Sequence, residues 1–459
     1  MKKRKKWIGV LLGAVCLFQV NTVPVQAEEY WPEGPQIAGE SAVVMEASTG
    51  TVLYDNNSHQ QSYPASITKI MTCFLAVENS SLDEEVTFSK NAIYKTAGGS
   101  GISRDVDEVM TMEECLYGLM LESANECGYA IAEHVGKDYE DFIRMMNDKA
   151  KELGCMDTHF NNPHGLPDEE HVTSAYDIAL ISRAALENDI FRMIVNSKRY
   201  TIPPTNKHEE ETYLVNHHKM LTNYQGDTQY LYDYCIGGKT GYTSVAGSTL
   251  ATFAEKDGMT LICVVTREQA PNHYLDTRVL FDYCFENFQL WNVAENEENY
   301  TQDIKENKIF ENEESFVGLN KEGSIVLPKA AAFTDAVPEI VEINGSKDVI
   351  GNIQYVYAGR KVGGTDIEVT GAKVSEFKFR KAEQEKTEEG KEKKEEKVLK
   401  INVKYIAFGV LAVVLLIGIG FGIYYIADNF YLIKYKMECR KQQKISFKEI
   451  KFKKNKRHK

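Results

Sequence analysis

Residues 63–72 read Tyr-Pro-Ala-Ser-Ile-Thr-Lys-Ile-Met-Thr, a segment that joins a helix start to two reactive side chains. Pro64 suits the first turn of a helix, and an apolar helical pattern continues to about Val77. Ser66 and Lys69 stand three positions apart, so on a helix they share one face. An amine beside a hydroxyl can take its proton if burial or a nearby cation lowers the pKa of the amine. The segment therefore predicts Ser66 as a catalytic nucleophile and Lys69 as its base.

A second motif, Ser123-Ala-Asn125, lies where one apolar helical segment ends and another begins. A connector at such a point can bring a hydroxyl and an amide against Lys69. From there Ser123 can pass a proton to a leaving amine, and Asn125 can hold Lys69 or a substrate amide. We therefore predict Ser123 as a catalytic residue and Asn125 as a substrate-binding residue.

A third motif, Lys239-Thr240-Gly241, follows two glycines and is typical of a strand edge. Glycine at such an edge lets a substrate backbone approach closely. Lys239 supplies a cation for a carboxylate, and Thr240 supplies a hydroxyl. The N–H of Tyr242, together with that of Ser66, is expected to form an oxyanion hole. The motif and the tyrosine after it are therefore predicted to bind substrate.

Similar fragments occur elsewhere in the chain, so each motif is weak when taken alone. Ser375 and Lys378 repeat the Ser-x-x-Lys spacing, but they adjoin a highly charged segment in which no pocket is expected. Ser89 and Asn91 repeat the Ser-x-Asn spacing, but they lie in a polar connection and not at the end of an apolar helix. Only the set that begins at Ser66 combines the three motifs in order.

The N-terminus, residues 1–27, reads as a secretory signal peptide. Five basic residues, Lys2 to Lys6, precede an apolar stretch from Trp7 to Val20. Val25-Gln-Ala27 then supplies small residues at the cleavage positions. We therefore expect export of the body of the protein, with an uncleaved anchor as the alternative.

Residues 28–292 are expected to form one domain that mixes a sheet with helices. Strand-like runs flank a turn in residues 41–54, and residues 111–187 are mostly helical. Strand character returns over 230–266 around an Asp-Gly hairpin turn, and a last helix spans Leu275–Phe288. This pattern predicts an α/β (α+β) catalytic domain with a helical subdomain.

The C-terminal part divides by composition into four segments. Residues 293–379 contain short alternating runs between turn signals such as Gly363-Gly, and they predict a small all-β domain. Residues 380–403, rich in Lys and Glu, predict a solvated linker. Residues 404–428 contain 23 consecutive uncharged residues, enough for one transmembrane helix. Residues 429–459 form a basic tail, which is expected on the cytoplasmic side.

The formal net charge of −14 conceals an asymmetry, because the chain from Lys434 onward carries 12 Lys or Arg against 2 Glu. The acidic remainder argues against a nucleic-acid-binding surface, and the basic end fits a membrane with anionic lipid. Seven cysteines remain between the two membrane segments, an odd number without a Cys-x-x-Cys pair. We expect them to be buried free thiols, and we predict no disulfide, no metal site and no cofactor.

With their flanking residues, the three motifs resemble the low-molecular-weight penicillin-binding proteins, the serine D-alanyl-D-alanine carboxypeptidases. The resemblance covers roughly residues 35–375. Four segments carry it most clearly: Pro64 to Thr72, Leu119 to Glu126, Met146 to Gly154, and Thr158 to Leu166. It implies a transpeptidase/β-lactamase-like catalytic domain followed by a small β-rich domain, with His164-Gly165 shaping a loop near the site.

The chemistry implied by the resemblance is an acyl-enzyme mechanism. Ser66 attacks the penultimate D-Ala of a peptidoglycan stem pentapeptide, the terminal D-Ala leaves, and water hydrolyses the acyl-enzyme. β-Lactam antibiotics are then covalent inhibitors at Ser66. Together with the membrane segments, this predicts a single-pass protein of the bacterial cell membrane whose catalytic domain lies on the extracytoplasmic face.

The chain also departs from the family pattern. Ala124 stands where the family commonly has Gly, and Tyr242 stands where a His often follows the third motif. The predicted anchor spans the membrane, whereas the usual family anchor is an amphipathic helix that lies on it. The family tends to use an Arg near the substrate carboxylate, and both Arg267 and Arg278 are candidates.

Three alternatives remain at this level. A class A β-lactamase shares the motifs, but it needs a deacylating Glu between the second and third motifs, and no Glu-x-x-Leu-Asn pattern occurs there. A membrane-bound β-lactam sensor would hold a stable acyl group on Ser66 and signal through the basic tail. An endopeptidase acting on cross-links would differ only in the leaving group.

Overall fold

The structure is a computed structural model that describes residues 30–298, 317–342 and 349–369. The predicted signal peptide 1–27, linker 380–403, transmembrane segment 404–428 and tail 429–459 lie outside the described residues. Within the described ranges, none of the helices combines the length and the apolar composition needed to cross a bilayer.

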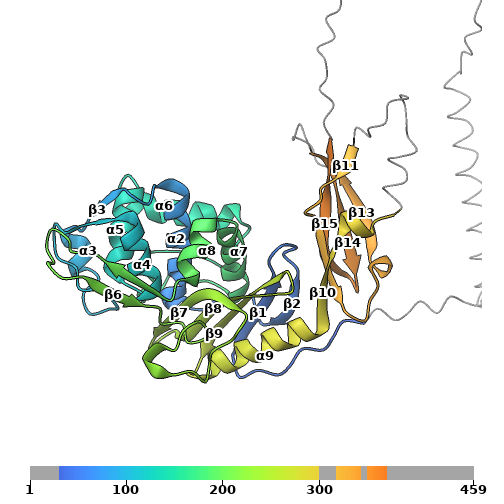
Figure 1. The fold of residues 1–459 in the computed structure, drawn as a ribbon, viewed down its shortest axis with the longest axis horizontal. Coiled ribbons are helices and arrows are strands. Elements are labelled where there is room, and N and C mark those ends of the chain that lie inside the picture. The colour runs from blue at the N-terminus through green and yellow to red at the C-terminus, as the bar shows by residue number, and fades with distance from the viewer. Residues whose placement is uncertain (1–29, 299–316, 343–348, 370–459) are drawn as a thin grey trace, which may run out of the picture. The chain divides into compact units, whose positions relative to one another are not determined.

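A five-stranded antiparallel sheet in the order β2-β1-β9-β8-β7 forms the centre of the N-terminal part (Figure 1). Its strands are β1 Ser41–Glu46, β2 Val52–Asn56, β7 Cys235–Thr243, β8 Gly247–Lys256 and β9 Met259–Glu268. The predicted hairpin between β8 and β9 is confirmed, because Asp257 and Gly258 turn with φ of 52° and 80°. Among the described strands β7 pairs with β8 alone, so it forms one edge of the sheet.

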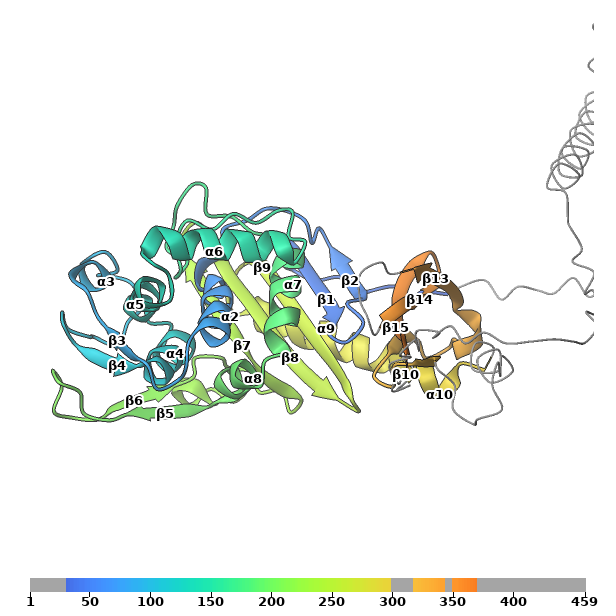
Figure 2. The ribbon, with the colours of Figure 1, turned by 90° about the horizontal axis from the view of Figure 1, so that it is seen from above.

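Helices cover both faces of this sheet (Figures 1 and 2). In β1, Val43 and Met45 belong to the apolar core shared with the helical block. Ala42 and Val44 point the other way, into the core formed with α9 Asn272–Asn287. All residues of β1 are buried, which explains its nearly unbroken apolar run in place of an alternating pattern.

The helical block carries the first two motifs. It consists of α2 Lys69–Asn79, α3 Lys90–Tyr94, α4 Met112–Leu121, α5 Asn125–Val135, α6 Tyr139–Glu152, α7 Ala175–Leu186 and α8 Asp189–Asn196. Thr111 and Glu114 form a capping box at the start of α4. Asp138 and Ser174 cap α6 and α7 by accepting hydrogen bonds from main-chain N–H groups. The prediction of a mostly helical region over 111–187 is therefore confirmed.

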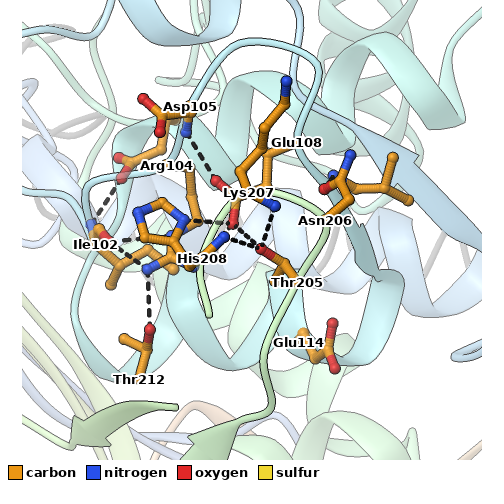
Figure 3. Close-up of polar contacts among 12 residues, drawn as sticks. Ile102, Arg104, Asp105, Glu108, Glu114, Thr205, Asn206, Lys207, His208 and Thr212 are labelled. Carbon is orange, nitrogen blue, oxygen red and sulfur yellow. Dashed lines mark hydrogen bonds and ion pairs between the residues drawn. The ribbon is translucent and has the colours of Figure 1, made fainter. Parts of the chain in front are cut away.

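Two short antiparallel pairs flank the helical block: β3 Glu85–Thr87 with β4 Val109–Thr111, and β5 Arg199–Ile202 with β6 Thr212–Val215. A polar cluster fastens the segment before β4 to the connection between β5 and β6 (Figure 3). Arg104 Nη1 lies 3.0 Å from Glu108 Oε1, and these side chains are 3% and 0% exposed. Thr205 and His208 also bond to Glu108 Oε1, at 2.7 and 3.0 Å.

A second, six-stranded sheet lies where the small all-β domain is predicted. Its order is β10-β12-β15-β14-β13, and β11 pairs with β15. The strands are β10 Phe288–Asn292, β11 Val317–Leu319, β12 Ser324–Pro328, β13 Val337–Glu342, β14 Val349–Tyr357 and β15 Arg360–Val369. This region also contains a short helix, α10 Val293–Asn296, and a 3₁₀ turn, η3 Phe333–Asp335.

Two details of this region differ from the sequence analysis. The sheet recruits β10 from residues before the predicted boundary at 293, because the chain becomes extended at Phe288 as soon as α9 ends. The predicted turn at Gly363-Gly is wrong, since both glycines lie inside β15. A Cβ on Gly363 would lie 2.3 Å from the carbonyl oxygen of Ser324, so glycine here allows β12 to approach. The turn lies instead at Ala358-Gly359, where both residues have positive φ.

All seven cysteines of the body are free thiols in the structure. Six are buried and Cys155 is partly buried. Cys263 lies in the middle of β9, where burial raises the pKa of its thiol to about 12. Such thiols pack as small apolar side chains, as expected.

Candidate active site

Ser66 lies in a 3₁₀ turn, η1 Ala65–Thr68, that leads directly into α2. The predicted helix is therefore tightened at its start, and Lys69 is its first α-helical residue. The Ser66 side chain is partly exposed, and its Oγ lies 3.1 Å from Lys69 Nζ. The fold thus joins the two residues of the first motif and leaves the hydroxyl accessible.

Lys69 is fully buried, and its Nζ has two close oxygen partners besides Ser66. Asn125 Oδ1 lies at 2.7 Å, and the carbonyl oxygen of His164 lies at 2.6 Å. Burial lowers the pKa of Lys69 well below its ordinary value, and the charge of Lys239 lowers it further. Burial and a neighbouring cation, either of which can lower the pKa of an amine enough for it to act as a base, are therefore both present.

Ser123 lies on the connector between α4 and α5, as predicted. It has φ of 61°, it is buried, and its Oγ has no hydrogen-bond partner among the described residues. Asn125 begins α5, and its N–H donates to the carbonyl oxygen of Ser100 at 2.9 Å. Of the two contacts considered for Asn125, the structure shows the one with Lys69, whereas the proton relay through Ser123 stays a prediction.

The third motif lies on β7, at the open edge of the sheet. A Cβ on Gly241 would lie 2.8 Å from Ser66 N and 2.3 Å from Thr249 Oγ1, so only glycine lets the strand pass this close to the serine. Thr249 Oγ1 donates to the carbonyl oxygen of Pro64 at 2.9 Å, which ties β8 to the same turn. The main chain before Tyr242 therefore runs beside the Ser66 N–H, as an oxyanion hole formed by these two residues requires.

Lys239 is nearly fully buried, and its Nζ donates to the carbonyl oxygen of Thr240 at 2.9 Å. Burial lowers the pKa of Lys239 to about 7, while the charge of Glu122 acts to raise it. Glu122 Oε2 is itself 2.7 Å from His217 Nε2. Burial acts to raise the pKa of Glu122, but the bonds from His217 and from the Val215 N–H outweigh it and hold that pKa below its usual value.

Part of the site has no signal in the sequence, although the family resemblance implies a loop at His164-Gly165 near the site. The contact of His164 with Lys69 is made by its carbonyl, which no side-chain pattern reveals. Gly165, with φ of 87°, brings the same loop against the serine turn. No sequence motif predicts the contact between Glu122 and His217 either. The sequence indicates only that Glu122 is adjacent to Ser123.

Three predicted residues have no hydrogen bond or ion pair with Ser66 or Lys69 in the described part of the chain: Tyr242, Arg267 and Arg278. Tyr242 is 71% exposed at the end of β7, so it is free to contact a bound ligand. Arg267 Nε pairs with Glu40 at 2.9 Å, and Arg278 donates to the carbonyl oxygens of Gln229 and Leu231. Neither arginine has a hydrogen bond or ion pair with the three motifs in the described part of the chain, so the structure does not single out one of them.

The site contains a hydroxyl, a buried amine and an amide, and strand β7 passes beside the Ser66 N–H. These groups suit covalent acyl transfer, in which a serine attacks a carbonyl and a neighbouring base takes its proton. No cluster of three or more His, Cys, Asp or Glu side chains within residues 30–298, 317–342 and 349–369 could hold a metal ion.

Comparison with known proteins agrees with this chemistry. The family model for D-alanyl-D-alanine carboxypeptidases matches residues 28–270. The chain is 32% identical to the carboxypeptidase DacF of Bacillus subtilis over 310 residues, which cover 66% of this chain and 75% of that protein. It is 29% identical to DacD of Escherichia coli over 343 residues, which cover 70% of this chain and 82% of that protein.

A solved structure of similar fold is that of the Streptomyces K15 DD-transpeptidase, with a TM-score of 0.51 and 28% sequence identity. The match covers 56% of this chain and all of that protein. The fold, the three motifs and the family match all lead to the same assignment. The chain belongs to the D-alanyl-D-alanine carboxypeptidase family of peptidases, the low-molecular-weight penicillin-binding proteins.

Proposed function

We propose that this chain is a serine D-alanyl-D-alanine carboxypeptidase with Ser66 as nucleophile and Lys69 as base. The observation that carries the proposal is the 3.1 Å approach of Lys69 Nζ to Ser66 Oγ in a site that buries the amine. Family membership supplies the substrate class, peptidoglycan stem peptides that end in D-Ala-D-Ala.

The first step is acylation. Ser66 Oγ attacks the carbonyl carbon of the penultimate D-Ala while Lys69 takes the hydroxyl proton. The N–H groups of Ser66 and Tyr242 stabilise the charge that develops on the carbonyl oxygen. The proton then passes to the nitrogen of the terminal D-Ala through Ser123, whose hydroxyl has no other partner among the described residues.

Strand β7 binds the substrate in this proposal. A peptide that lies along this open edge places its terminal carboxylate near Lys239 and Thr240. The positive form of Lys239 attracts the carboxylate, and Thr240 offers it a hydroxyl. Asn125 is held by Lys69 through its Oδ1, which leaves its amide N–H groups for the substrate.

The second step is deacylation. After the terminal D-Ala leaves, water attacks the ester carbonyl, the bond to Ser66 Oγ breaks, and the serine regains its proton. A β-lactam acylates Ser66 by the same attack, but its ring-opened product leaves more slowly. No Glu-x-x-Leu-Asn pattern occurs between the second and third motifs, which argues against a β-lactamase of class A type.

The test uses the full chain in detergent with a stem pentapeptide that ends in D-Ala-D-Ala. Wild type is expected to release D-Ala and to bind a fluorescent penicillin covalently, and Ser66→Ala is expected to do neither. Ser89→Ala is a suitable control, since Ser89 only caps α3 through the Ala92 N–H and its loss should leave turnover intact.

The outcomes separate the alternatives. D-Ala release that survives in Ser66→Ala would remove Ser66 as nucleophile. Long-lived penicillin labelling of wild type without D-Ala release would instead favour the sensor. Rapid hydrolysis of penicillin would favour a β-lactamase.

We also propose that residues 404–428 anchor the enzyme as a single membrane span, with residues 429–459 in the cytoplasm. The support is the uncharged run from Tyr405 to Ala427, followed by a basic segment. The full chain should stay with membranes after alkaline carbonate washing, and a tag on the tail should resist protease added to intact protoplasts. Release by carbonate would rule out the span.

A further inference from the structure

Ala65, the residue before the proposed nucleophile, adopts a backbone conformation that alanine normally avoids. Its φ is 50°, in the left-handed region, and the residue is 1% exposed. The orientation of the peptide between Ala65 and Ser66 sets the direction of the Ser66 N–H and of the side chain that follows. The surrounding structure must therefore hold this peptide in place.

A chain of three hydrogen bonds ends on the carbonyl of Ala65. The hydroxyl of Thr68 donates to Ala65 O at 2.9 Å, and Thr68 Oγ1 lies 2.9 Å from His171 Nε2. The main-chain N–H of Asn161 donates to His171 Nδ1 at 2.9 Å. Because Nδ1 accepts a hydrogen bond, the ring hydrogen of the neutral imidazole is on Nε2. His171 therefore donates to Thr68, and Thr68 donates to Ala65.

This arrangement is buried. Thr68 is 0% exposed and His171 is 1% exposed, and the imidazole packs against the ring of Phe160 with centroids 5.6 Å apart. Burial lowers the pKa of His171 to about 3, so the ring is neutral at any pH at which the protein is expected to work. The tautomer, and with it the direction of the hydrogen bonds, is therefore constant.

The loop that carries His171 also touches the site in two other places. A Cβ on Gly165 would lie 1.8 Å from Ala65 O, so the loop passes directly over this carbonyl. The next carbonyl back, that of His164, accepts from Lys69 Nζ at 2.6 Å. The same loop therefore contacts Lys69 through the carbonyl of His164. It also contacts the turn at Ala65, through the imidazole of His171 and the hydroxyl of Thr68.

We propose that Thr68 and His171 are positioning residues for Ser66, which fix the left-handed turn at Ala65 and so aim the serine hydroxyl and N–H at the substrate carbonyl. The inference rests on the proposed function, because it assigns the pair to the acylation step. In the described part of the chain, neither side chain has a hydrogen bond with the other two motifs, so neither is given a share in binding the substrate carboxylate.

The test compares variants that keep or lose single hydrogen bonds. Thr68→Val removes the hydroxyl at nearly constant volume, and Thr68→Ser restores it. His171→Gln places an amide N–H near the position of Nε2 and keeps the donor to Thr68. His171→Asn places a carbonyl near the position of Nδ1, so it keeps the bond from Asn161 and loses the contact with Thr68. Thr277→Val, in α9, controls for loss of a buried threonine hydroxyl that bonds its own helix.

Acylation by fluorescent penicillin, kcat and KM for D-Ala release, and the melting temperature are measured on the full chain in detergent. A small misplacement of reacting groups costs about 10²-fold in rate, so we expect Thr68→Val and His171→Asn to lose roughly 10- to 100-fold in acylation and kcat. KM should change little, because β7 is untouched. Thr68→Ser and His171→Gln should recover most of the rate.

Equal acylation rates for Thr68→Val, Thr277→Val and wild type would overturn the inference. The inference would also be overturned if the acylation rates of His171→Gln and His171→Asn fell equally and in proportion to the fall in melting temperature. Such a result would indicate a merely structural role for His171. Failure of the proposed function looks different, because wild type itself would then neither release D-Ala nor become labelled.

Discussion

Lys239 illustrates how one buried side chain couples binding to pH. Burial lowers its pKa to about 7, and Glu122, held by His217, acts to raise it. Lys69 and His218 also sense the charge of Lys239: burial first and this charge second lower the pKa of His218 to about 3 and that of Lys69 well below its ordinary value. The free enzyme therefore carries a charged Lys239 mainly below neutral pH.

We expect kcat/KM for D-Ala release to fall as the pH rises above about 7, because a neutral Lys239 no longer attracts the substrate carboxylate. Glu122→Gln removes the neighbouring charge, so this alkaline limb should move to lower pH. A pH series from 5 to about 9 with both proteins measures the shift. Glu209→Gln, an exposed change in the connection between β5 and β6, should leave the limb in place. An unmoved limb in Glu122→Gln would mean that a different group titrates.

The sequence could predict site residues that form a side-chain motif. It could not predict the parts of the site that depend on main-chain conformation. The order and spacing of the three motifs predicted Ser66, Lys69, Asn125 and Lys239, because the chemistry proposed for them depends on side-chain type. The left-handed turn at Ala65 leaves no trace in the sequence, since alanine is not selected for that conformation. His171 belongs to none of the three motifs, so nothing in the sequence singled it out.

At the scale of elements, the arm formed by β5 and β6 depends on polar contacts near its tip. Arg104 donates to the carbonyl oxygen of Ile102 and to Thr212 Oγ1, and it pairs with Glu108 (Figure 3). The same segment supplies the Ile102 N–H to Glu126, next to Asn125 in α5. One link between the tip of the arm and α5, which begins with Asn125, therefore runs through this buried ion pair.

Glu108→Gln should destabilise the protein by about 3 kcal/mol, because it leaves the Arg104 guanidinium buried without its counter-charge. The double variant Arg104→Met, Glu108→Gln removes both charges and should cost less than the two single changes added together. Chemical unfolding of the four proteins gives the coupling free energy. Additive costs would show that Arg104 and Glu108 do not act as a pair.

Elements were predicted well where local chemistry decides them. The capping box at Thr111 and the caps at Asp138 and Ser174 mark true helix starts because each satisfies main-chain N–H groups locally. The prediction of a turn at Gly363 was wrong, because the sequence does not distinguish a glycine required by a neighbouring strand from a glycine in a turn. The 3₁₀ start of the Ser66 helix also depends on contacts from β7 and the His164 loop.

For the molecule as a whole, one buried carboxyl group makes stability depend on pH. Glu268, at the end of β9, is 5% exposed, and burial together with the nearby charge of Asp276 raises its pKa to about 8. Asp276 is held by the N–H groups of Ala38 and Gly39. The pKa of Glu268 is higher in the folded protein than in the unfolded chain, so protonated Glu268 favours folding. This contribution to the free energy of unfolding is fully present below about pH 4.3 and is lost as the pH rises through about 8.

Glu268→Gln cannot ionise, so it escapes this loss. We expect its melting temperature relative to wild type to rise by roughly 3 °C or more between pH 5 and pH 9, given about 2–4 °C per kcal/mol for a domain of this size. Differential scanning calorimetry at both pH values measures it. Glu286→Gln, an exposed change on α9, should show no such trend. A constant difference for Glu268→Gln would show that Glu268 is ionised throughout this range.

The place of β1 in the main sheet constrains the order in which the polypeptide can mature. β1 is synthesised first, yet its partner β9 comes from the far end of the catalytic domain. Until β9 emerges, the apolar residues of β1 have no permanent neighbour on that side, and β7 is not yet joined to β1 through β8 and β9. A nascent chain therefore has no working nucleophile and must be protected from association with other chains. Activity appears only when synthesis of the whole domain is complete, so truncated products should be both inactive and prone to aggregate.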